Sequence, residues 1–246
     1  MLVNRLTAPG PVAGWCLLLL STPALAAHLS GGADFGYTAS SGNSRTSNLD
    51  TKLRLRYKSG RWTHKLHLGA LASSKSGQST AERYTGGGKS EYDFSAHNYA
   101  FGRVQYIKDL FAGIRQHVSE TAGYGRRLLE VDGGNQSLDA EVGAGFSQTQ
   151  EQKPSLKRHS DVIGQLGLNY RYIISKTSRF KQTLTVQSGR ANTFMESVTG
   201  LHLTIDGNLG AQISYTVDHN TTVPASLSKT DTYTSIALSY QFGNGS

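Results

Sequence analysis

The sequence predicts an all-β fold, a transmembrane antiparallel up-and-down β-barrel of about 12 strands that forms one domain. Three observations lead to this prediction. Apolar and polar residues alternate with a period of two, the period of a β-strand, along most of the chain. The first residues have the pattern of an export signal. After Ala27, no stretch approaches the about 20 apolar residues that a membrane-spanning helix needs, so strands must make any membrane crossing.

The export signal is expected over residues 1–26, and the barrel domain over residues 27–246. A short apolar run, Val12–Leu20, precedes the cleavage motif Ala24-Leu25-Ala26 and is too short to span a bilayer. The single cysteine, Cys16, lies inside this signal. The mature chain therefore contains no disulfide bond, and its stability must come from the sheet itself.

Three segments show the alternation most clearly, residues 49–57, 62–70 and 138–146. In the first, Leu53 and Leu55 alternate with charged residues such as Lys52. Successive side chains of a strand point to opposite faces, so each of these strands has one apolar and one charged face. With an export signal and no helical segment, this pattern is typical of a barrel with a lipid-facing outside and a polar interior.

Twelve strands follow from this pattern and from the turn-rich residues between its segments. Their expected spans are 31–40, 45–58, 61–73, 80–95, 98–108, 116–131, 136–150, 159–174, 179–189, 194–205, 208–218 and 230–242. Short turns are expected at Ser59-Gly60, His97, Asp132–Asn135, Ser175–Ser178 and Asp206-Gly207. Longer loops are expected at Ser74–Ser79, Asp109–Arg115, Glu151–Arg158 and His219–Lys229. Outer-membrane barrels have short periplasmic turns, so an even strand count places both termini in the periplasm.

Strand length and aromatic residues favour a membrane barrel over a soluble periplasmic β-sandwich, which stays the alternative fold. The expected strands run about 11–18 residues, whereas strands of soluble proteins usually have about 5–6. Rings that are suited to a bilayer interface gather near the expected strand ends. They are Tyr57, Trp62, Tyr92, Phe94, Tyr99, Tyr170, Tyr172, Phe180, Tyr215, Tyr240 and Phe242.

The formal net charge of +8 indicates an acidic or anionic neighbour. Nucleic acid is excluded, because the chain is exported and carries no recognisable binding module. The expected partners are outer-membrane lipid and lipopolysaccharide, with the barrel-assembly machinery during insertion, and the location is the cell outer membrane. Cations in the expected outer loops would bind the glycolipid phosphates, and the alternative is that they are ordinary solvated loop charges. They are Lys75, Arg115, Lys153, Lys157, Arg158 and Lys229.

Several short segments together resemble the salt-induced outer membrane proteins of Gram-negative bacteria, a family of unknown molecular function. The matching segments are Ser41–Ser44, Gly60–Trp62, Ala81–Tyr84, Phe101–Arg103, Lys108–Phe111, Ala122–Gly125, Ser214–Val217 and Lys229–Thr232. The resemblance covers residues 31–242 and implies an outer-membrane β-barrel in a context of salt or osmotic stress. It brings no catalytic or ligand-binding residues.

Charged residues on the polar face are the candidate site. Those expected to face the lumen are Lys52, Arg54, Arg56, Lys65, Arg83, Lys89, Glu91, Asp93, Arg103, Asp139, Glu141, Arg171 and Lys181. Two hypotheses stay open: a salt-bridged structural interior, or a narrow pore that prefers anions because of its basic strands. Inward glycines are expected to leave room for water. They are Gly69, Gly87, Gly143, Gly145 and Gly167.

A non-enzymatic role is expected. The alternative from another class is an outer-membrane lipid hydrolase of phospholipase type that uses His117 and Ser119, two residues apart on one strand face. Spacing assigns no third catalytic group, and Glu120 points to the other face. The eight histidines are scattered, so no metal ion or other cofactor is expected.

Overall fold

The fold is an all-antiparallel β-barrel of twelve strands. The computed structural model describes residues 28–40, 46–75, 78–110, 112–131, 134–152, 156–223 and 228–243. The strands are β1 (His28–Ser40), β2 (Thr46–Ser59), β3 (Trp62–Lys75), β4 (Gln78–Asp93), β5 (Asn98–Asp109), β6 (Ile114–Glu130), β7 (Gln136–Glu151), β8 (Arg158–Ser175), β9 (Ser178–Ser188), β10 (Thr193–Asp206), β11 (Leu209–Asn220) and β12 (Thr230–Phe242). The expected signal peptide, residues 1–26, lies outside these ranges. No helix in the described ranges is long and apolar enough to cross a membrane.

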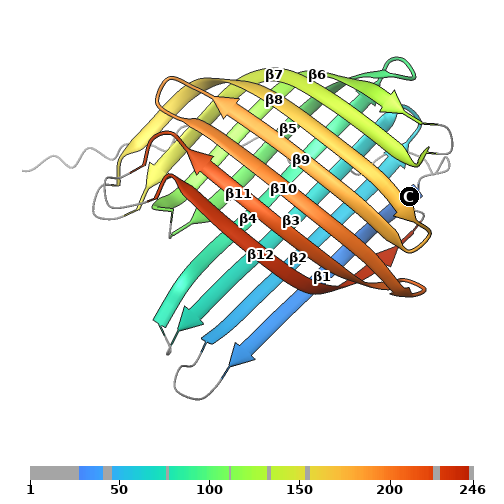
Figure 1. The fold of residues 1–246 in the computed structure, drawn as a ribbon. Helices are drawn as coiled ribbons and strands as arrows, with labels where there is room; N and C mark the ends of the chain where they lie inside the picture. The colour runs from blue at the N-terminus through green and yellow to red at the C-terminus, as the bar shows by residue number, and fades with distance from the viewer. Residues whose placement is uncertain are drawn as a thin grey trace, which may run out of the picture.

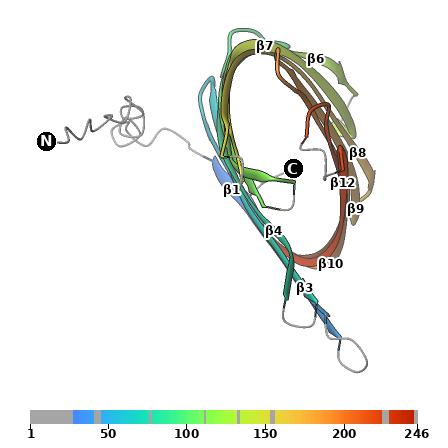
Figure 2. The same ribbon diagram turned by 90° about the vertical axis from the view of Figure 1, so that its left-hand side faces the viewer.

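Each strand pairs with its neighbours in the sequence, and β1 pairs with β12 to close the ring. The predicted up-and-down barrel is therefore confirmed (Figure 1). Viewed from one end, along the barrel axis, the ring has an oval cross-section (Figure 2). The closing seam is short, because β1 pairs with β12 only between Gly31 and Phe35, whereas β1 pairs with β2 along its whole length.

The two ends of the barrel differ. The connections after β2, β4, β6, β8 and β10 lie at one end, the turn end, together with the start of β1 and the end of β12. The other connections lie at the opposite end, the loop end. There, β1 to β4 extend beyond the rest of the wall (Figure 1). The connection expected to be long at Ser74–Ser79 is short, because β3 continues to Lys75 and β4 begins at Gln78.

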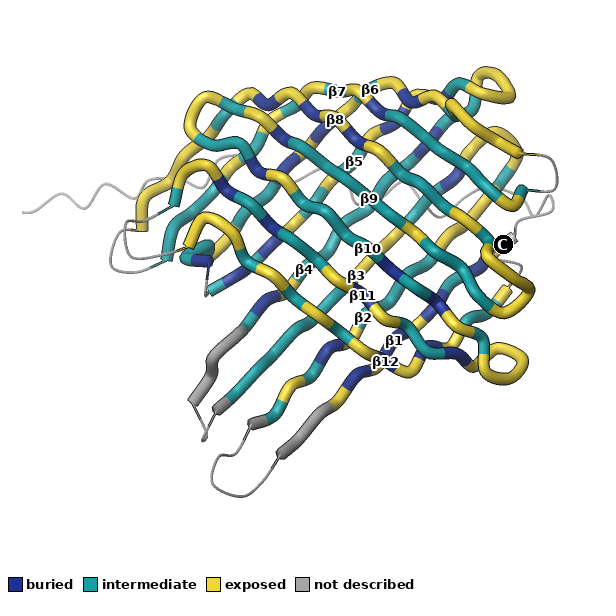
Figure 3. Tube along the Cα trace, in the orientation of Figure 1, coloured by how far each residue is buried: buried dark blue, intermediate teal, exposed yellow. Residues whose placement is uncertain are grey.

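The barrel is apolar outside and polar inside, the reverse of a water-soluble protein. Ile236, Phe146 and Val162 point outward and are 70%, 69% and 68% exposed. Glu141 and Gln165 point inward and are 4% and 1% exposed. Exposed and covered positions alternate along the strands (Figure 3). The two-residue period in the sequence thus becomes two chemically different surfaces.

An aromatic band surrounds part of the turn end. Trp62 stacks on His64 with ring centroids 5.8 Å apart and tilts against Tyr92 at 5.0 Å. Amphipathic rings in such a band suit the boundary between lipid and water. Tyr99, which was expected in this band, instead faces the lumen, where its hydroxyl donates a hydrogen bond to Glu141 Oε1 at 2.8 Å. It lies near a strand end, but its place in the alternation puts it on the inner face.

The inner wall of β6 and β7 is built from glycines covered by aromatic rings. A β-carbon on Gly125 would collide with the ring of Tyr99, and one on Gly143 would lie 3.2 Å from the ring of Phe101. The rings therefore lie flat on the sheet, as in the aromatic covering of strand glycines that stabilises other β-sheets. The strand backbone also comes close, because Gly143 faces the Ala122 carbonyl.

The expectation that inward glycines leave room for water is wrong for all five positions. The imidazole of His67 covers Gly87, Thr85 Oγ1 covers Gly69, and the Glu141 carboxylate covers Gly167. Gly143 and Gly145 are covered by the Phe101 ring and by neighbouring backbone. In a narrow barrel, the space that a glycine leaves is filled by the larger side chain of a neighbouring residue.

We expect Gly143→Ala to lower the free energy of unfolding by about 1–3 kcal/mol, because the new methyl group meets a carbonyl oxygen and an aromatic ring. Equilibrium urea unfolding of the folded barrel measures this loss. Gly164→Ala is the matched control, since nothing lies within 4 Å of its β-carbon position. Equal losses in both variants would contradict the proposed packing of the Phe101 ring.

Candidate functional site in the barrel lumen

The inner face carries the charged residues of the candidate site. The structure places all thirteen sequence-predicted residues on this face, within strands β2 to β9. They do not form one cluster. Some join a salt-bridged network, some pair with other acids, and four form no ion pair or hydrogen bond within the described residues, namely Arg56, Asp139, Arg171 and Lys181.

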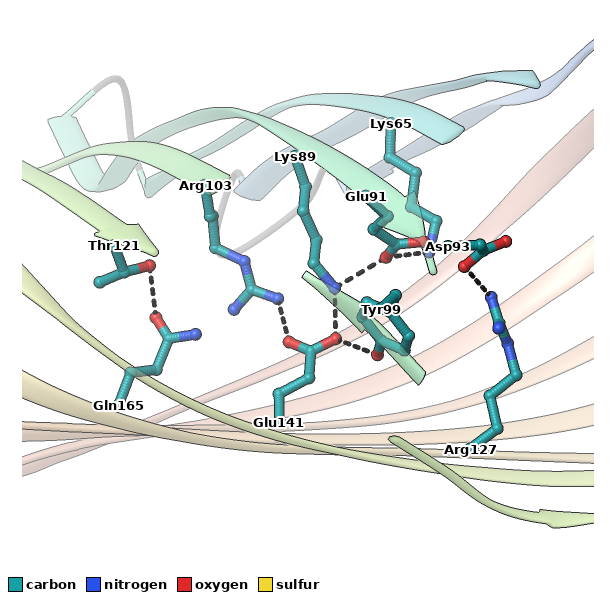
Figure 4. Close-up of polar contacts among 10 residues, drawn as sticks. All are labelled: Lys65, Lys89, Glu91, Asp93, Tyr99, Arg103, Thr121, Arg127, Glu141 and Gln165. Carbon is teal, nitrogen blue, oxygen red and sulfur yellow. Dashed lines mark hydrogen bonds and ion pairs between the residues drawn. The ribbon is translucent and has the colours of Figure 1, made fainter. Parts of the chain in front are cut away.

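A salt-bridged network occupies the wall from β3 to β7 (Figure 4). Lys65 Nζ lies 2.6 Å from Glu91 Oε1, and Lys89 Nζ lies 2.7 Å from the same oxygen. Lys89 also bonds Glu141, whose other carboxylate oxygen is 2.8 Å from Arg103 Nη2. Two buried carboxylates thus hold three cations, so these charges are satisfied internally and fill this side of the lumen.

Two further pairs extend the salt-bridged part of the lining. Arg127 Nη2 lies 2.8 Å from Asp93 Oδ1 near the turn end. Arg54 makes a bidentate contact with Asp34, whose Oδ1 accepts a hydrogen bond from Nη2 at 2.9 Å. Bidentate charge-assisted pairs are among the strongest hydrogen bonds in proteins, so Arg54 is firmly oriented along the wall.

One arginine crosses the lumen near the loop end. Arg83 on β4 bonds Asp218 on β11, and its Nη2 lies 3.2 Å from Glu196 Oε2 on β10. Asp109 on β5 is 3.5 Å from the same guanidinium. The hydroxyl of Tyr233 on β12 donates a hydrogen bond to Asp109 Oδ2 at 2.8 Å. These contacts join opposite walls, and they narrow the lumen at this level.

A second zone, nearer the turn end and between β2–β3 and β8–β9, contains three bases that have no acidic partner within the described residues. Arg56 lies directly opposite Lys65 on neighbouring strands, and Arg171 lies directly opposite Lys181. The positive charges of Lys65, Arg54, Arg171 and Arg56 all act on Lys181. Arg56, Arg171 and Lys181, which we call the basic slot, form no hydrogen bond or ion pair within the described part of the chain.

The slot brings together two walls that are far apart in the sequence. β2 and β3 contribute bases from one side, and β8 and β9 contribute bases from the other. Like charges on facing walls repel, so they do not close the lumen by pairing, as Arg83 and Asp218 do. The lining is therefore salt-bridged in one region and positively charged in another.

Several partners in the lumen were absent from the sequence-predicted set, namely Asp34, Asp109, Arg127, Glu196 and Asp218. For some of them, the alternation of inner and outer residues along the strand already indicated a place in the lumen. Asp34 sits between Ala33 and Phe35, both on the outer face, and so belongs to the inner face. Asp109 was expected in a loop, but β5 continues through it.

The geometry does not assemble the hydrolase site considered from the sequence. His117 and Ser119 share the inner face of β6, away from the apolar outer surface. His117 Nδ1 is 2.8 Å from Thr149 Oγ1, and Ser119 accepts a hydrogen bond from Gln187 Nε2 at 3.3 Å. Neither contact gives a serine activated by a base. Within the described ranges, no group of three or more His, Cys, Asp or Glu side chains has the geometry to hold a metal ion.

We expect Glu141→Gln to lower the free energy of unfolding by about 3–5 kcal/mol, because Lys89 and Arg103 would lose the carboxylate that they share. Equilibrium urea unfolding measures the change. Asp139→Asn is the control. Asp139 lies on the same strand and face and makes no ion pair or hydrogen bond within the described residues. If the two variants lose the same stability, the network does not stabilise the wall.

The fold is similar to those of solved outer-membrane proteins. The NanC porin matches with a TM-score of 0.51 and 11% identity, over 88% of this chain and 100% of that one. An outer membrane channel from Pseudomonas putida F1 matches with a TM-score of 0.51 and 14% identity, over 90% of this chain and 97% of that one. These likenesses show an outer-membrane porin-like or channel-like barrel fold.

Sequence comparison gives the family. The uncharacterized protein YdiY of Escherichia coli K12 is 26% identical over 211 residues, which is 85% of this chain and 82% of the relative. Residues 33–242 match the family described as "Protein of unknown function, DUF481". The chain therefore belongs to this family of proteins of unknown function.

Proposed function

We propose that the protein is a non-enzymatic component of the Gram-negative outer membrane whose barrel conducts small anions through a narrow polar lumen. The observation that carries the proposal is the basic slot, in which Arg56, Arg171 and Lys181 have no acidic partner within the described residues. When the charges that line a channel all have the same sign and its walls have a low dielectric constant, counter-ions concentrate in the channel. Small anions are the counter-ions of this slot.

The salt-bridged network sets the width of the proposed pore. Twelve strands enclose a lumen between those of filled eight-stranded barrels and wide porins. Side chains from β3 to β7 occupy one side of it, which leaves a slot between β2–β3 and β8–β9. The pore would therefore suit small solutes rather than folded polymers.

The outer surface supports the membrane location. It is lined by large apolar side chains, and the barrel fold is similar to those of a porin and an outer membrane channel. At the loop end, exposed Arg115, Lys157, Arg158 and Lys229 suit the phosphates of lipopolysaccharide. We include the barrel-assembly machinery as the partner during insertion. A role in salt or osmotic stress is supported by the family resemblance in the sequence alone.

We expect the purified barrel to give single-channel currents in a planar bilayer, with a reversal potential in a salt gradient that indicates anion preference. Replacing two slot bases in Lys181→Gln/Arg171→Gln should lower the anion-to-cation permeability ratio at least about twofold, because the field that attracts anions weakens. Arg126→Gln is the matched control, since Arg126 is exposed on the outer face of β6.

Two results would count against the pore. Folded protein that gives no current would be a plugged scaffold. A cation-selective current, or an equal change with Arg126→Gln, would mean that the basic slot does not set selectivity.

We expect Leu68→Asp to impair insertion and to cost up to about 2 kcal/mol of stability in lipid, because Leu68 is 47% exposed on the outer face and would place a charge in hydrocarbon. His67→Asp is the matched control, since it introduces the same residue one position away on the inner face, opposite Arg54. Insertion into lipid vesicles and urea unfolding there measure both. Equal defects would mean that the outer surface does not meet lipid.

A further inference from the structure

A cavity of about 120 Å³ lies inside the barrel at the loop end, apart from the basic slot. We propose that this cavity binds a small organic cation, a short aliphatic amine with one or two primary ammonium groups. The site does not depend on the proposed conduction of anions, because binding here needs neither an open lumen nor the slot residues.

The charge of the cavity wall favours a cation. Its lining includes one guanidinium, that of Arg83, and five carboxylates. The carboxylates are those of Asp109, Glu151, Asp161, Asp218 and Asp231. An anion would be repelled from this wall, in contrast to the basic slot farther along the lumen.

Three of the nearby carboxylates form a row across adjacent strands. Glu196 on β10 is the register partner of Asp218 on β11, and Asp218 is the register partner of Asp231 on β12. Like charges directly opposite each other destabilise a sheet. Arg83 bonds Glu196 and Asp218, whereas Asp231 forms no hydrogen bond or ion pair within the described residues. The single positive charge of Arg83 is therefore smaller than the negative charge of the three carboxylates. A bound cation would neutralise more of that charge.

Unpaired acceptors supply an independent indication of a ligand. Asp218 Oδ1 and Gln187 Oε1 are buried without a hydrogen-bond partner, and both side chains line the cavity and are 3% exposed. A buried acceptor without a donor is costly. Both atoms accept hydrogen bonds, so the group that satisfies them must donate, as an ammonium does with its three N–H bonds.

The remaining wall is apolar, which fixes the second part of the ligand. Ile107, Ile163 and Phe194 line the cavity and are 4%, 3% and 8% exposed. Methylene groups would pack on these side chains, and the Phe194 ring can also take a cation on its face. A cavity of about 120 Å³ is slightly smaller than one that holds benzene, so the ligand has about six non-hydrogen atoms. The geometry does not suit a metal ion, since the described residues hold no metal-binding group.

The test is isothermal titration calorimetry of the folded full chain in detergent micelles with three probes: 1,4-diaminobutane, the uncharged 1,4-butanediol of equal length, and calcium chloride. We expect saturable one-to-one binding of the diamine and no binding of the diol. Asp231→Asn and Gln187→Leu should each weaken diamine binding at least tenfold. Asp139→Asn, which removes the same charge near the turn end, should leave it unchanged.

Four outcomes would overturn the proposal: no heat of diamine binding, equal binding of the diol, equal weakening by Asp139→Asn, or calcium binding that displaces the diamine. The urea midpoint of each variant shows whether it is folded. Asp231→Asn keeps the test decisive if Gln187→Leu does not fold, because Asp231 forms no ion pair within the described part of the chain. Diamine binding in a barrel that carries no current would reject the proposed pore and leave this site standing.

Discussion

The closure of the sheet is the constraint on which the rest of the structure depends. When β1 pairs with β12, every strand gains an inner and an outer face, and the lateral edge that an open sheet exposes is paired along the seam. The two-residue period then sorts the whole sequence into two surfaces. An apolar outside requires a solvent of hydrocarbon, and a polar inside requires that many charges be satisfied within a narrow space. Both requirements follow from the closure of the sheet.

The lumen meets the second requirement unevenly. From β3 to β7, the two carboxylates of Glu91 and Glu141 hold Lys65, Lys89 and Arg103, so the charges of this network are paired. Elsewhere the lining carries an excess of one sign, positive around Lys181 and negative around Asp218 and Asp231. Unbalanced charge weakens a fold, and proteins keep such departures mainly where they serve a function. The contrast between the two zones is the reason that we place different ions in them.

The strand count, the faces and the turn end were predictable, because alternation and turn residues are local signals. β5 shows the limit of this information, since its last residue, Asp109, was expected in a loop, although the strand alternation continues to it. Contacts across the lumen were not predictable. Arg83 and Asp218 meet although 135 positions separate them, and their meeting depends on the stagger of the closed ring, which no single strand encodes. The position of Tyr99 shows that closeness to a strand end does not decide which face a ring takes.

The central claim is that hydrocarbon contacts the outer face and water the inner one. Since Cys16 is the one cysteine of the sequence and lies in the expected signal, single spin-labelled cysteines can be placed along β8 of the mature chain in lipid vesicles. The account predicts that labels at Leu166 and Leu168 are relaxed by oxygen, and that labels at Asn169 and Arg171, which are half-buried on the inner face, are relaxed by a water-soluble nickel complex. Equal accessibility to the nickel complex at all four positions would contradict it.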